Sequence, residues 1–351
     1  MEYTHGGDIW SAQTHCGKEI LDFSANLSPL GMPRAVARGA EMAVADAVHY
    51  PDPLCRKLVA AIAGHDGVAT EQVLCGNGAA DLIFRLAYGL RPRRALITAP
   101  TFSEYREALE AADCRVLSHR LLAERDFVLT DSILSDLTED LDICFLCTPN
   151  NPTGRMIERK LMEDILARCA ENHIILVVDE CFLELTADEN EGLSGMLDRY
   201  PNLVLLRAFT KSYAMPGLRL GYCLTADTVL LEKLARCGQP WSVSGPAQAA
   251  GLAALEYCPD HPKAARAVIS RERKWLTENL KELGLKVFPS EANYLLFRAA
   301  GVFDLKEQLI DRGILIRSCA NYEGLGGDDY RIAVRPHKEN IVLISALKEV
   351  L

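Results

Sequence analysis

Short apolar runs alternate with longer amphipathic segments from about residue 72 to residue 225. The short runs are typical of buried strands: QVLC (72–75), RALITA (94–99), DICFLCT (142–148), HIILVVD (173–179), NLVLLRA (202–208) and RLGYCL (219–224). Three segments between them show helical spacing: DLIFRLAYGL (81–90), SEYREALEAAD (103–113) and RKLMEDILARCAEN (159–172). This alternation predicts an α/β fold, in which helices cover both faces of a largely parallel sheet.

The pattern changes after about residue 245. Helices are expected near 262–283, 303–312 and 340–351, and strands at KVFP (286–289), ANYLLFR (292–298), ILIRS (314–318) and YRIAV (330–334). Mixed strands and helices of this kind favour a smaller α+β domain. We therefore expect a large domain over 48–245 and a small domain over 246–351. The segment 1–47, with LDFSANLSPLG, is expected to form an arm and part of the small domain.

Composition narrows the class of protein. The 351 residues are 49% apolar and 25% charged, which is ordinary for a soluble globular protein. A formal charge of -10 argues against nucleic acid or an anionic membrane as partner, although a small anionic substrate remains compatible with it. The chain starts with no secretory signal and carries no apolar stretch long enough to cross a bilayer, so we predict a cytoplasmic protein.

Twelve cysteines are scattered along the chain. Cys144 and Cys147 are close in sequence, but residues three apart on a strand point to opposite faces of a sheet. We expect reduced thiols in the core, and no metal or redox site.

The segment FTKSYAMPGLRLGY (209–222) places Lys211 among aromatic and small apolar residues. Burial near other cations lowers the pKa of a lysine, and the neutral amine is a nucleophile that forms a Schiff base with an aldehyde. The alternative is a lysine whose amine reaches outward to solvent.

An anion-binding turn is expected at GNGAAD (76–81), which follows a strand and opens a helix. Thr210 and Arg219, on either side of Lys211, could add a hydroxyl and a guanidinium to the same phosphate. A plain strand-to-helix turn is the alternative.

Two polar residues follow buried strands. Asp179 ends HIILVVD, and a protonated pyridine nitrogen would give this carboxylate the cationic partner it needs. Asn151, in CTPNNPTG, could bond the phenolic oxygen of the same ring. The alternatives are a helix-capping or ion-paired aspartate and an ordinary turn.

Taken in this order, the motifs resemble those of one family. The stretch TKSYAMPGLRLG (210–221) is similar to the signature (S/T)-K-x₄-P-G-L-R-x-G of pyridoxal-phosphate enzymes with the aspartate-aminotransferase fold, fold type I. The resemblance covers essentially the whole chain. It implies that Lys211 carries pyridoxal 5′-phosphate, that Asp179 pairs with the pyridinium and that Asn151 bonds the ring oxygen. The remaining cofactor contacts it implies are Gly78, Ala79, Thr210 and Arg219 on the phosphate, Phe102 stacked on the ring with Tyr105 as a second candidate, and Tyr50 of HYPDP on the phosphate of a neighbouring subunit.

The resemblance also implies how the subunits assemble and which residue bonds the phenolic oxygen of the cofactor ring. The role implied for Tyr50 predicts a homodimer. Many relatives carry a tyrosine three residues after the aspartate, where this chain has Phe182. Because phenylalanine cannot donate a hydrogen bond, Asn151 would act alone on the ring oxygen.

Within the family the chain is most similar to histidinol-phosphate aminotransferases and to the threonine-phosphate decarboxylases of cobalamin biosynthesis. The segments that favour the decarboxylases are THGGDIW, LDFSANLSPLGMP, QPWSVSGPAQ, SEANYLLFR and ILIRSCANYEGL. The resemblance implies these substrate contacts: Arg331 and Asn151 near the carboxylate, Arg317, His5 and Gly6 on the phosphate, and Asn26 as a further contact. For Arg317 and Arg335 the alternative is a surface ion pair, and nothing in the sequence improves on that alternative for Arg335.

The expected reaction is the loss of carbon dioxide from L-threonine O-3-phosphate, which gives (R)-1-amino-2-propanol O-2-phosphate. Residue types alone do not separate decarboxylation from transamination, because the orientation of the substrate decides which bond breaks. The rival hypotheses are a histidinol-phosphate aminotransferase and a pyridoxal-phosphate-binding protein without turnover.

Overall fold

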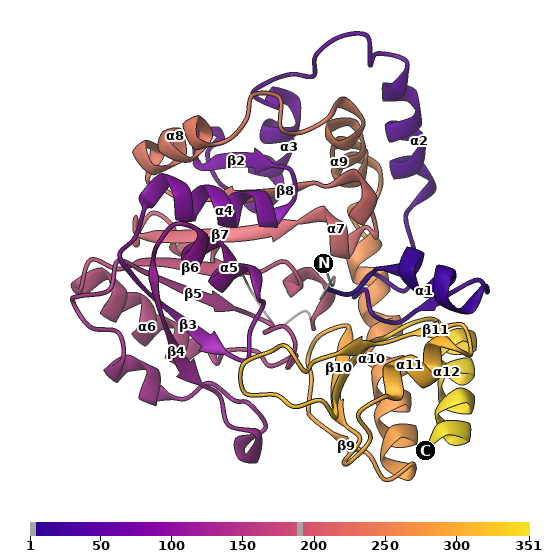
Figure 1. Cartoon of the computed structure of the whole chain (residues 1–351). Helices are drawn as coiled ribbons and strands as arrows, with labels where there is room; N and C mark the ends of the chain where they lie inside the picture. The colour runs from indigo at the N-terminus through magenta and orange to yellow at the C-terminus, as the bar shows by residue number, and fades with distance from the viewer. Residues whose placement is uncertain (1–4, 188–191) are drawn as a thin grey trace.

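A seven-stranded sheet is the largest element of the computed structural model, which describes residues 5–187 and 192–351 (Figure 1). In spatial order its strands are β2 (Val73–Gly76), β8 (Gly221–Leu224), β7 (Leu203–Ala208), β6 (Ile175–Asp179), β5 (Ile143–Cys147), β3 (Arg94–Ala99) and β4 (Arg115–Arg120). Strand β8 is antiparallel to both of its neighbours, and the other adjacent pairs are parallel. The predicted α/β fold with a largely parallel sheet is confirmed.

Helices cover both faces of this sheet, and the side chains of each strand alternate between the two layers. One core cluster joins Cys144 and Leu146 of β5 to α3 (Arg56–Asp66) and α6 (Arg159–Glu171). The other joins Phe145 and Cys147 to α4 (Ala79–Leu90), α5 (Glu104–Ala111) and α8 (Thr228–Cys237). The expectation that Cys144 and Cys147 point to opposite faces is therefore confirmed.

Strand β4 has no counterpart among the predicted strands. Its sequence RVLSHR is largely polar and only partly buried, and it lies at one of the two edges of the sheet. Its partly exposed polar side chains interrupt the apolar run that identified the other strands, whereas β2, at the opposite edge, is mostly buried and was predicted.

The C-terminal elements form a second layer beside the sheet (Figure 1). Their antiparallel sheet has the order β12 (Arg317–Ser318), β13 (Asp329–Ala333), β10 (Tyr294–Arg298) and β9 (Lys286–Val287). Helices α10 (His261–Glu282), α11 (Leu305–Ile310) and α12 (His337–Val350) pack with them. The N-terminal strand β1 (Leu21–Asp22) pairs in parallel with β11 (Ile314–Leu315).

The single strand predicted at 314–318 is divided in the structure. Its first half, β11, belongs with β1, and its second half, β12, pairs with β13. Apolar alternation runs through both halves, so the sequence pattern does not show the change of partner.

The remaining helices connect these layers. They are α1 (Ile9–Cys16), α2 (Arg34–Val44), α7 (Phe209–Ser212) and α9 (Gly245–Tyr257), with short 3₁₀ turns η1 (Thr70–Gln72), η2 (Ala123–Arg125), η3 (Asp131–Ser135), η4 (Leu183–Leu185), η5 (Ser194–Met196) and η6 (Pro216–Leu218). Helix α2 packs along α9, where the Cα of Gly39 faces the backbone of Ala249. In the described part of the chain, no helix combines the length and the apolar character needed to cross a bilayer.

Candidate active site

The candidate site lies beyond the carboxyl ends of the parallel strands, where ligands of such sheets bind. Strand β6 ends at Asp179, β5 is followed by Asn151, and β7 runs directly into α7, which carries Lys211. The loop after β3 leads to Phe102 and α5. Residues that are far apart in sequence are brought together because parallel strands end at one edge of the sheet.

Lys211 lies partly buried in the single turn of α7, against the aromatic ring of Phe182. Its Nζ is 5.5 Å from the centre of that ring, within range of a cation–π contact. Burial lowers the pKa of the Lys211 amine, and the positive charges of Arg331 and Arg219 lower it further, against the opposing effects of Cys181 and Asp179. The neutral, nucleophilic form of the amine is thus favoured over that of an exposed lysine.

Asp179 is a buried carboxylate held by two donors. The Tyr105 hydroxyl donates to Oδ2 at 2.6 Å, and the backbone N–H of Cys181 donates to Oδ1 at 2.9 Å. Burial, and then the charge of Asp179, raise the pKa of Tyr105 well above its usual value, so the phenol stays a proton donor. The arrangement keeps Asp179 oriented and leaves its charge for a cationic ligand.

The hydrogen bond also decides between the two aromatic candidates for stacking. Tyr105 is fully buried, its ring stacks on Phe145 with a centroid distance of 5.2 Å, and its hydroxyl donates a hydrogen bond to Asp179. It therefore lines no open space, and its candidacy for stacking on a ligand ring was wrong. Phe102 is partly exposed and meets the edge of Tyr105 at 5.6 Å, so it remains the stacking candidate.

Gly78 and Ala79 form a tight turn into α4, next to the guanidinium of Arg219. A Cβ at Gly78 would stand 2.6 Å from Arg219 Nη2, and the φ of Gly78 is +82°, which glycine adopts without strain. Gly221 of β8 lies beneath the same turn, since a Cβ there would meet the Ala79 nitrogen at 2.6 Å. The Arg219 guanidinium therefore packs against the turn that opens α4, which places a cation at the amino end of that helix, where anions bind readily. Thr210 is buried in α7, next to Lys211 in sequence.

Asn151 and Arg331 meet across the site. A guanidinium nitrogen of Arg331, Nη1, donates to Asn151 Oδ1, and Nη2 donates to the carbonyl of Ser24 at 2.7 Å. With its oxygen engaged in this way, the Asn151 side chain can present its amide N–H groups to a ligand oxygen.

Arg317 and Arg331 lie directly opposite each other on the antiparallel strands β12 and β13. Both are buried, with 8% and 5% of their surface exposed. Among residues 5–187 and 192–351, neither guanidinium has a carboxylate within ion-pair distance. Asn321 Oδ1 accepts from Arg317 at 2.7 Å, and the ring of Tyr322 lies 5.2 Å from its guanidinium carbon. Like charges directly opposite each other on neighbouring strands are unfavourable, and an anionic ligand would offset them.

The surface ion pair considered for Arg317 is therefore wrong. For Arg335 the same alternative is confirmed, because its Nε donates to Glu339 Oε2 at 2.7 Å one helical turn away. Burial and hydrogen-bond partners therefore show different environments for Arg317 and Arg335, which the sequence alone could not distinguish.

The N-terminal arm reaches the same site. His5 Nδ1 lies 3.4 Å from Glu104 Oε1, and burial together with the charges of Arg317 and Arg331 lowers the pKa of His5 against the opposing effect of Glu107. Gly6 passes so close to the chain that a Cβ would stand 2.3 Å from the Ser24 carbonyl oxygen. The Gly7 N–H donates to Ser24 Oγ at 2.7 Å, which ties the arm to the segment after β1.

Asn26 lies in that segment and is buried, and within the described residues its Oδ1 has no hydrogen-bond partner. A buried amide oxygen without a donor is costly, and a ligand amine or water would satisfy it.

Glu104 is a site residue that the sequence reasoning missed. Its side chain is 15% exposed, and it accepts a hydrogen bond from the Ser103 hydroxyl at 3.1 Å. Burial raises the pKa of this carboxyl to about 7, the charge of Glu107 adds to the rise, and Lys211 opposes it. Because the pKa of the facing His5 is lowered while that of Glu104 is raised, both groups are shifted toward their neutral forms, and a permanent ion pair between them is disfavoured near neutral pH.

Tyr50 lies outside the site of its own chain. Its ring is 78% exposed and stacks on Trp241 at a centroid distance of 4.3 Å. Met42, Val44, Val48 and Leu54 are exposed nearby in sequence.

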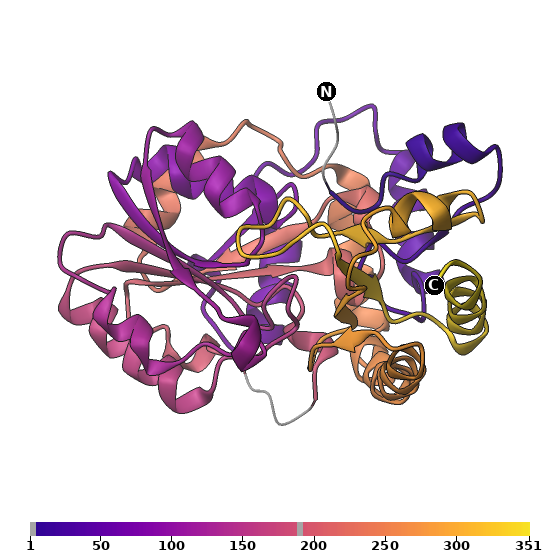
Figure 2. The ribbon, with the colours of Figure 1, turned by 60° about the horizontal axis from the view of Figure 1, so that its bottom comes forward.

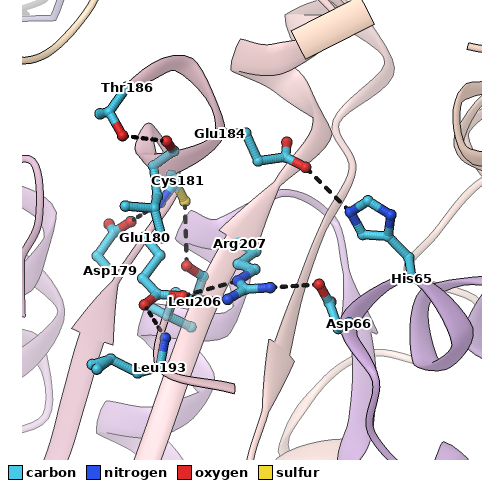
Figure 3. Close-up of polar contacts among 11 residues, drawn as sticks. His65, Asp66, Asp179, Glu180, Cys181, Glu184, Thr186, Leu193, Leu206 and Arg207 are labelled. Carbon is cyan, nitrogen blue, oxygen red and sulfur yellow. Dashed lines mark hydrogen bonds and ion pairs between the residues drawn. The ribbon is translucent and has the colours of Figure 1, made fainter. Parts of the chain in front are cut away.

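A group of charged side chains joins β6, which ends at Asp179, to β7, which leads into the turn of Lys211 (Figure 3). Arg207 of β7 donates to Glu180 Oε2 through Nε at 2.9 Å and Nη2 at 2.6 Å, and to Asp66 at the end of α3 through Nη1. His65, beside Asp66, lies 3.4 Å from Glu184. The residue after Asp179 and the residue four before Lys211 are thus joined to each other and to one helix end.

The chain is similar in sequence to known proteins of one family. The family described as "Aminotransferase class I and II" matches residues 18–347. A curated threonine-phosphate decarboxylase of Salmonella typhimurium is 41% identical over 352 residues, which cover 99% of this chain and 96% of the relative.

Two solved structures are also similar. The histidinol-phosphate aminotransferase of Clostridium acetobutylicum aligns with a TM-score of 0.87 and 28% identity, over 94% of this chain and 99% of that one. The L-threonine-O-3-phosphate decarboxylase of Porphyromonas gingivalis aligns with a TM-score of 0.84 and 25% identity, over 93% and 98%.

Proposed function

The chain belongs to the aminotransferase class I and II family, and from this premise we propose that it removes carbon dioxide from L-threonine O-3-phosphate to form (R)-1-amino-2-propanol O-2-phosphate. The cofactor is pyridoxal 5′-phosphate, on which this family depends. The proposed reaction would serve cobalamin biosynthesis, as the resemblance in sequence implied. Identity of 41% to a threonine-phosphate decarboxylase over almost the whole chain favours this reaction over transamination of histidinol phosphate.

The observation that carries the choice of substrate is the pair of buried arginines. Arg317 and Arg331 face each other without a carboxylate partner in the described chain. A phosphorylated amino acid brings a phosphate and a carboxylate, and each planar guanidinium can bond two oxygens of one of them.

The residues described above fit the cofactor. Arg219 lies against Gly78 at the amino end of α4, and Thr210 is buried beside Lys211 in α7, so the amides of Gly78 and Ala79 together with Thr210 and Arg219 would hold its phosphate. Asp179 would face the ring nitrogen, Asn151 the ring oxygen and Phe102 one face of the ring. When bound, the cofactor supplies an electron sink that weakens a bond at the substrate Cα.

The chain's own groups would then carry out the remaining tasks. The Lys211 amine, whose lowered pKa favours the neutral nucleophilic form, would anchor the cofactor. Once the substrate has taken its place, the same Nζ would accept a proton from the substrate ammonium and later return a proton to Cα. Arg331, helped by Asn151, would hold the substrate carboxylate, while Arg317, His5 and Gly6 would hold the phosphate and Asn26 would make a further contact. With both ends of the substrate fixed, its tilt is fixed too, and this decides which Cα bond breaks.

We also propose that the protein is a cytoplasmic homodimer. Tyr50 and Trp241 stack on each other at the surface, and Met42, Val44, Val48 and Leu54 are exposed apolar residues close to Tyr50 in sequence. A second copy would cover them, and Tyr50 would then reach the partner's cofactor phosphate. All twelve cysteines are free, which suits a reducing compartment.

One experiment separates the reactions. Purified protein loaded with pyridoxal phosphate is mixed with phosphothreonine in the absence of any keto acid. Continuous release of carbon dioxide and formation of aminopropanol phosphate are expected. A need for a keto acid, with conversion of the cofactor to pyridoxamine phosphate, would instead support an aminotransferase.

A further inference from the structure

The loop between β12 and β13, residues 319–328, extends from the C-terminal layer to the edge of the large sheet (Figure 2). Tyr322 is buried in the same core cluster as Leu96 and Leu121 of the large sheet region. Gly324, with a φ of +91°, lies against Pro100, since a Cβ would stand 3.6 Å from Pro100 Cδ. The loop is therefore packed on the segment that follows β3, next to the cofactor side of the site.

Glu323 is the charged residue of this loop that fastens it to the large sheet. Its Oε2 accepts from Arg106 Nη2 of α5 at 2.8 Å and from Ser118 Oγ of β4 at 2.7 Å. Its Oε1 lies 3.8 Å from Arg120 Nη2 at the end of β4. Ser118 also accepts from Arg106 at 2.7 Å, so the three side chains close a triangle of hydrogen bonds.

The same loop holds Arg317. Asn321, two residues before Glu323, accepts from Arg317 Nη2, and Tyr322, the residue next to Glu323, places its ring against the guanidinium. The orientation of Arg317 thus depends on a loop whose outer end is held by residues of a different layer. Asn321 and Tyr322 are of the residue types that orient a guanidinium without neutralising its charge.

We propose that Glu323 is a positioning residue for phosphate recognition: by joining the loop to Arg106 and Ser118, it holds Asn321 and Tyr322 in place around Arg317. This inference rests on the proposed role of Arg317 in binding the substrate phosphate. It deepens that role, since affinity for the phosphate then depends on a contact between the C-terminal layer and α5. The carboxylate of Glu323 itself does not touch the substrate.

The test uses the cofactor-loaded enzyme and four variants: Glu323→Ala, Glu323→Gln, the exchanged pair Glu323→Arg with Arg106→Glu, and Glu349→Ala as control. Glu349 pairs with Arg312 at 3.2 Å on the surface of the C-terminal layer, away from the loop. KM and kcat for phosphothreonine are measured together with the affinity for inorganic phosphate by titration calorimetry. Calorimetry keeps the test independent of the proposed reaction, because it reports binding even if phosphothreonine is not turned over.

Partly exposed ion pairs contribute modestly, so Glu323→Ala is expected to raise KM and the dissociation constant for phosphate about fivefold. The value of kcat and the absorbance of the bound cofactor should change less than about twofold in Glu323→Ala. The phosphate affinity of Glu323→Gln should lie between those of wild type and Glu323→Ala, and the exchanged pair should recover most of the lost affinity. Glu349→Ala should behave as wild type. Unchanged phosphate affinity in Glu323→Ala, or an equal loss in Glu349→Ala, would overturn the proposal. Absence of turnover in the wild type with intact phosphate binding would count against the proposed function and not against the role of Glu323.

Discussion

The substitution Glu104→Gln tests the electrostatics of the site most directly. Glu104 lies in the first turn of α5, between the His5 imidazole and the Ser103 hydroxyl. The charge of Glu107 raises its pKa, and the charge of Lys211 lowers it. Glutamine has the shape of the protonated acid but cannot ionise. The variant therefore removes the penalty of a buried carboxylate and keeps the contacts of its neutral form.

The magnitude follows from the pKa. Burial raises the pKa of Glu104 from 4.5 to about 7 in the folded protein, so the unfolded chain releases this proton first as pH rises. The folded wild type loses stability relative to the variant between pH 4.5 and 7, and the loss is complete above that window. The difference between these two pKa values corresponds to about 3 kcal/mol in the free energy of unfolding. For a chain of 351 residues it corresponds to a rise in Tm of about 4 °C in the variant.

The assay is denaturation of both proteins at pH 4.5 and at pH 8, each stripped of cofactor so that the Lys211 amine, whose charge acts on Glu104, is unmodified in both. Glu104→Gln should be more stable at pH 8 and nearly equal to wild type at pH 4.5. Glu110→Gln, on the exposed side of the same helix, should change stability by less than about 0.5 kcal/mol at either pH. An advantage of Glu104→Gln that is the same at both pH values would refute the reasoning, because it would not depend on ionisation.

Three further substitutions address the cofactor and the substrate. Lys211→Ala should abolish the visible band of the bound cofactor, recorded by absorbance, and an unchanged spectrum would mean that another residue is the anchor. Arg317→Ala should raise KM for phosphothreonine about a hundredfold with little effect on the cofactor spectrum, because charge-assisted bonds to the phosphate are lost; unaltered kinetics would place the phosphate elsewhere. Tyr105→Phe removes one of the two donors to Asp179 and should weaken cofactor binding about tenfold in a fluorescence titration. Equal affinity in that variant would show that the Cys181 amide alone is enough to orient the carboxylate.

The sequence predicted the parts of the fold that are buried on both sides. Strands β3, β5, β6 and β7 were recognised because each reads as a continuous apolar run, and their ends placed Asp179, Asn151 and Lys211 near one another. Edge strand β4 was missed because its polar residues resemble a loop. In the same way, the run 314–318 shows no sign that its two halves pair with different strands.

Residue roles were harder to predict than residue positions. Phe102 and Tyr105 are both aromatic residues of one segment, and only burial and the bond to Asp179 assign them different tasks. The raised pKa of Glu104 depends on burial and on His5, which is nearly a hundred residues away in sequence. Such effects come from tertiary contacts, which no local pattern records.

The start of α5 has a consequence for how this region can vary. Within four residues, Phe102 is the proposed contact of the cofactor ring, Glu104 faces His5 of the arm and Tyr105 bonds Asp179, and Arg106 follows with its bond to Glu323. Each added residue turns a helix by about 100° and advances it by about 1.5 Å. A one-residue insertion or deletion at Ser103 would therefore misalign several of these partners together, whereas exchanges of side chains could affect them one at a time. We expect this stretch to accept substitutions far more readily than any change in its length.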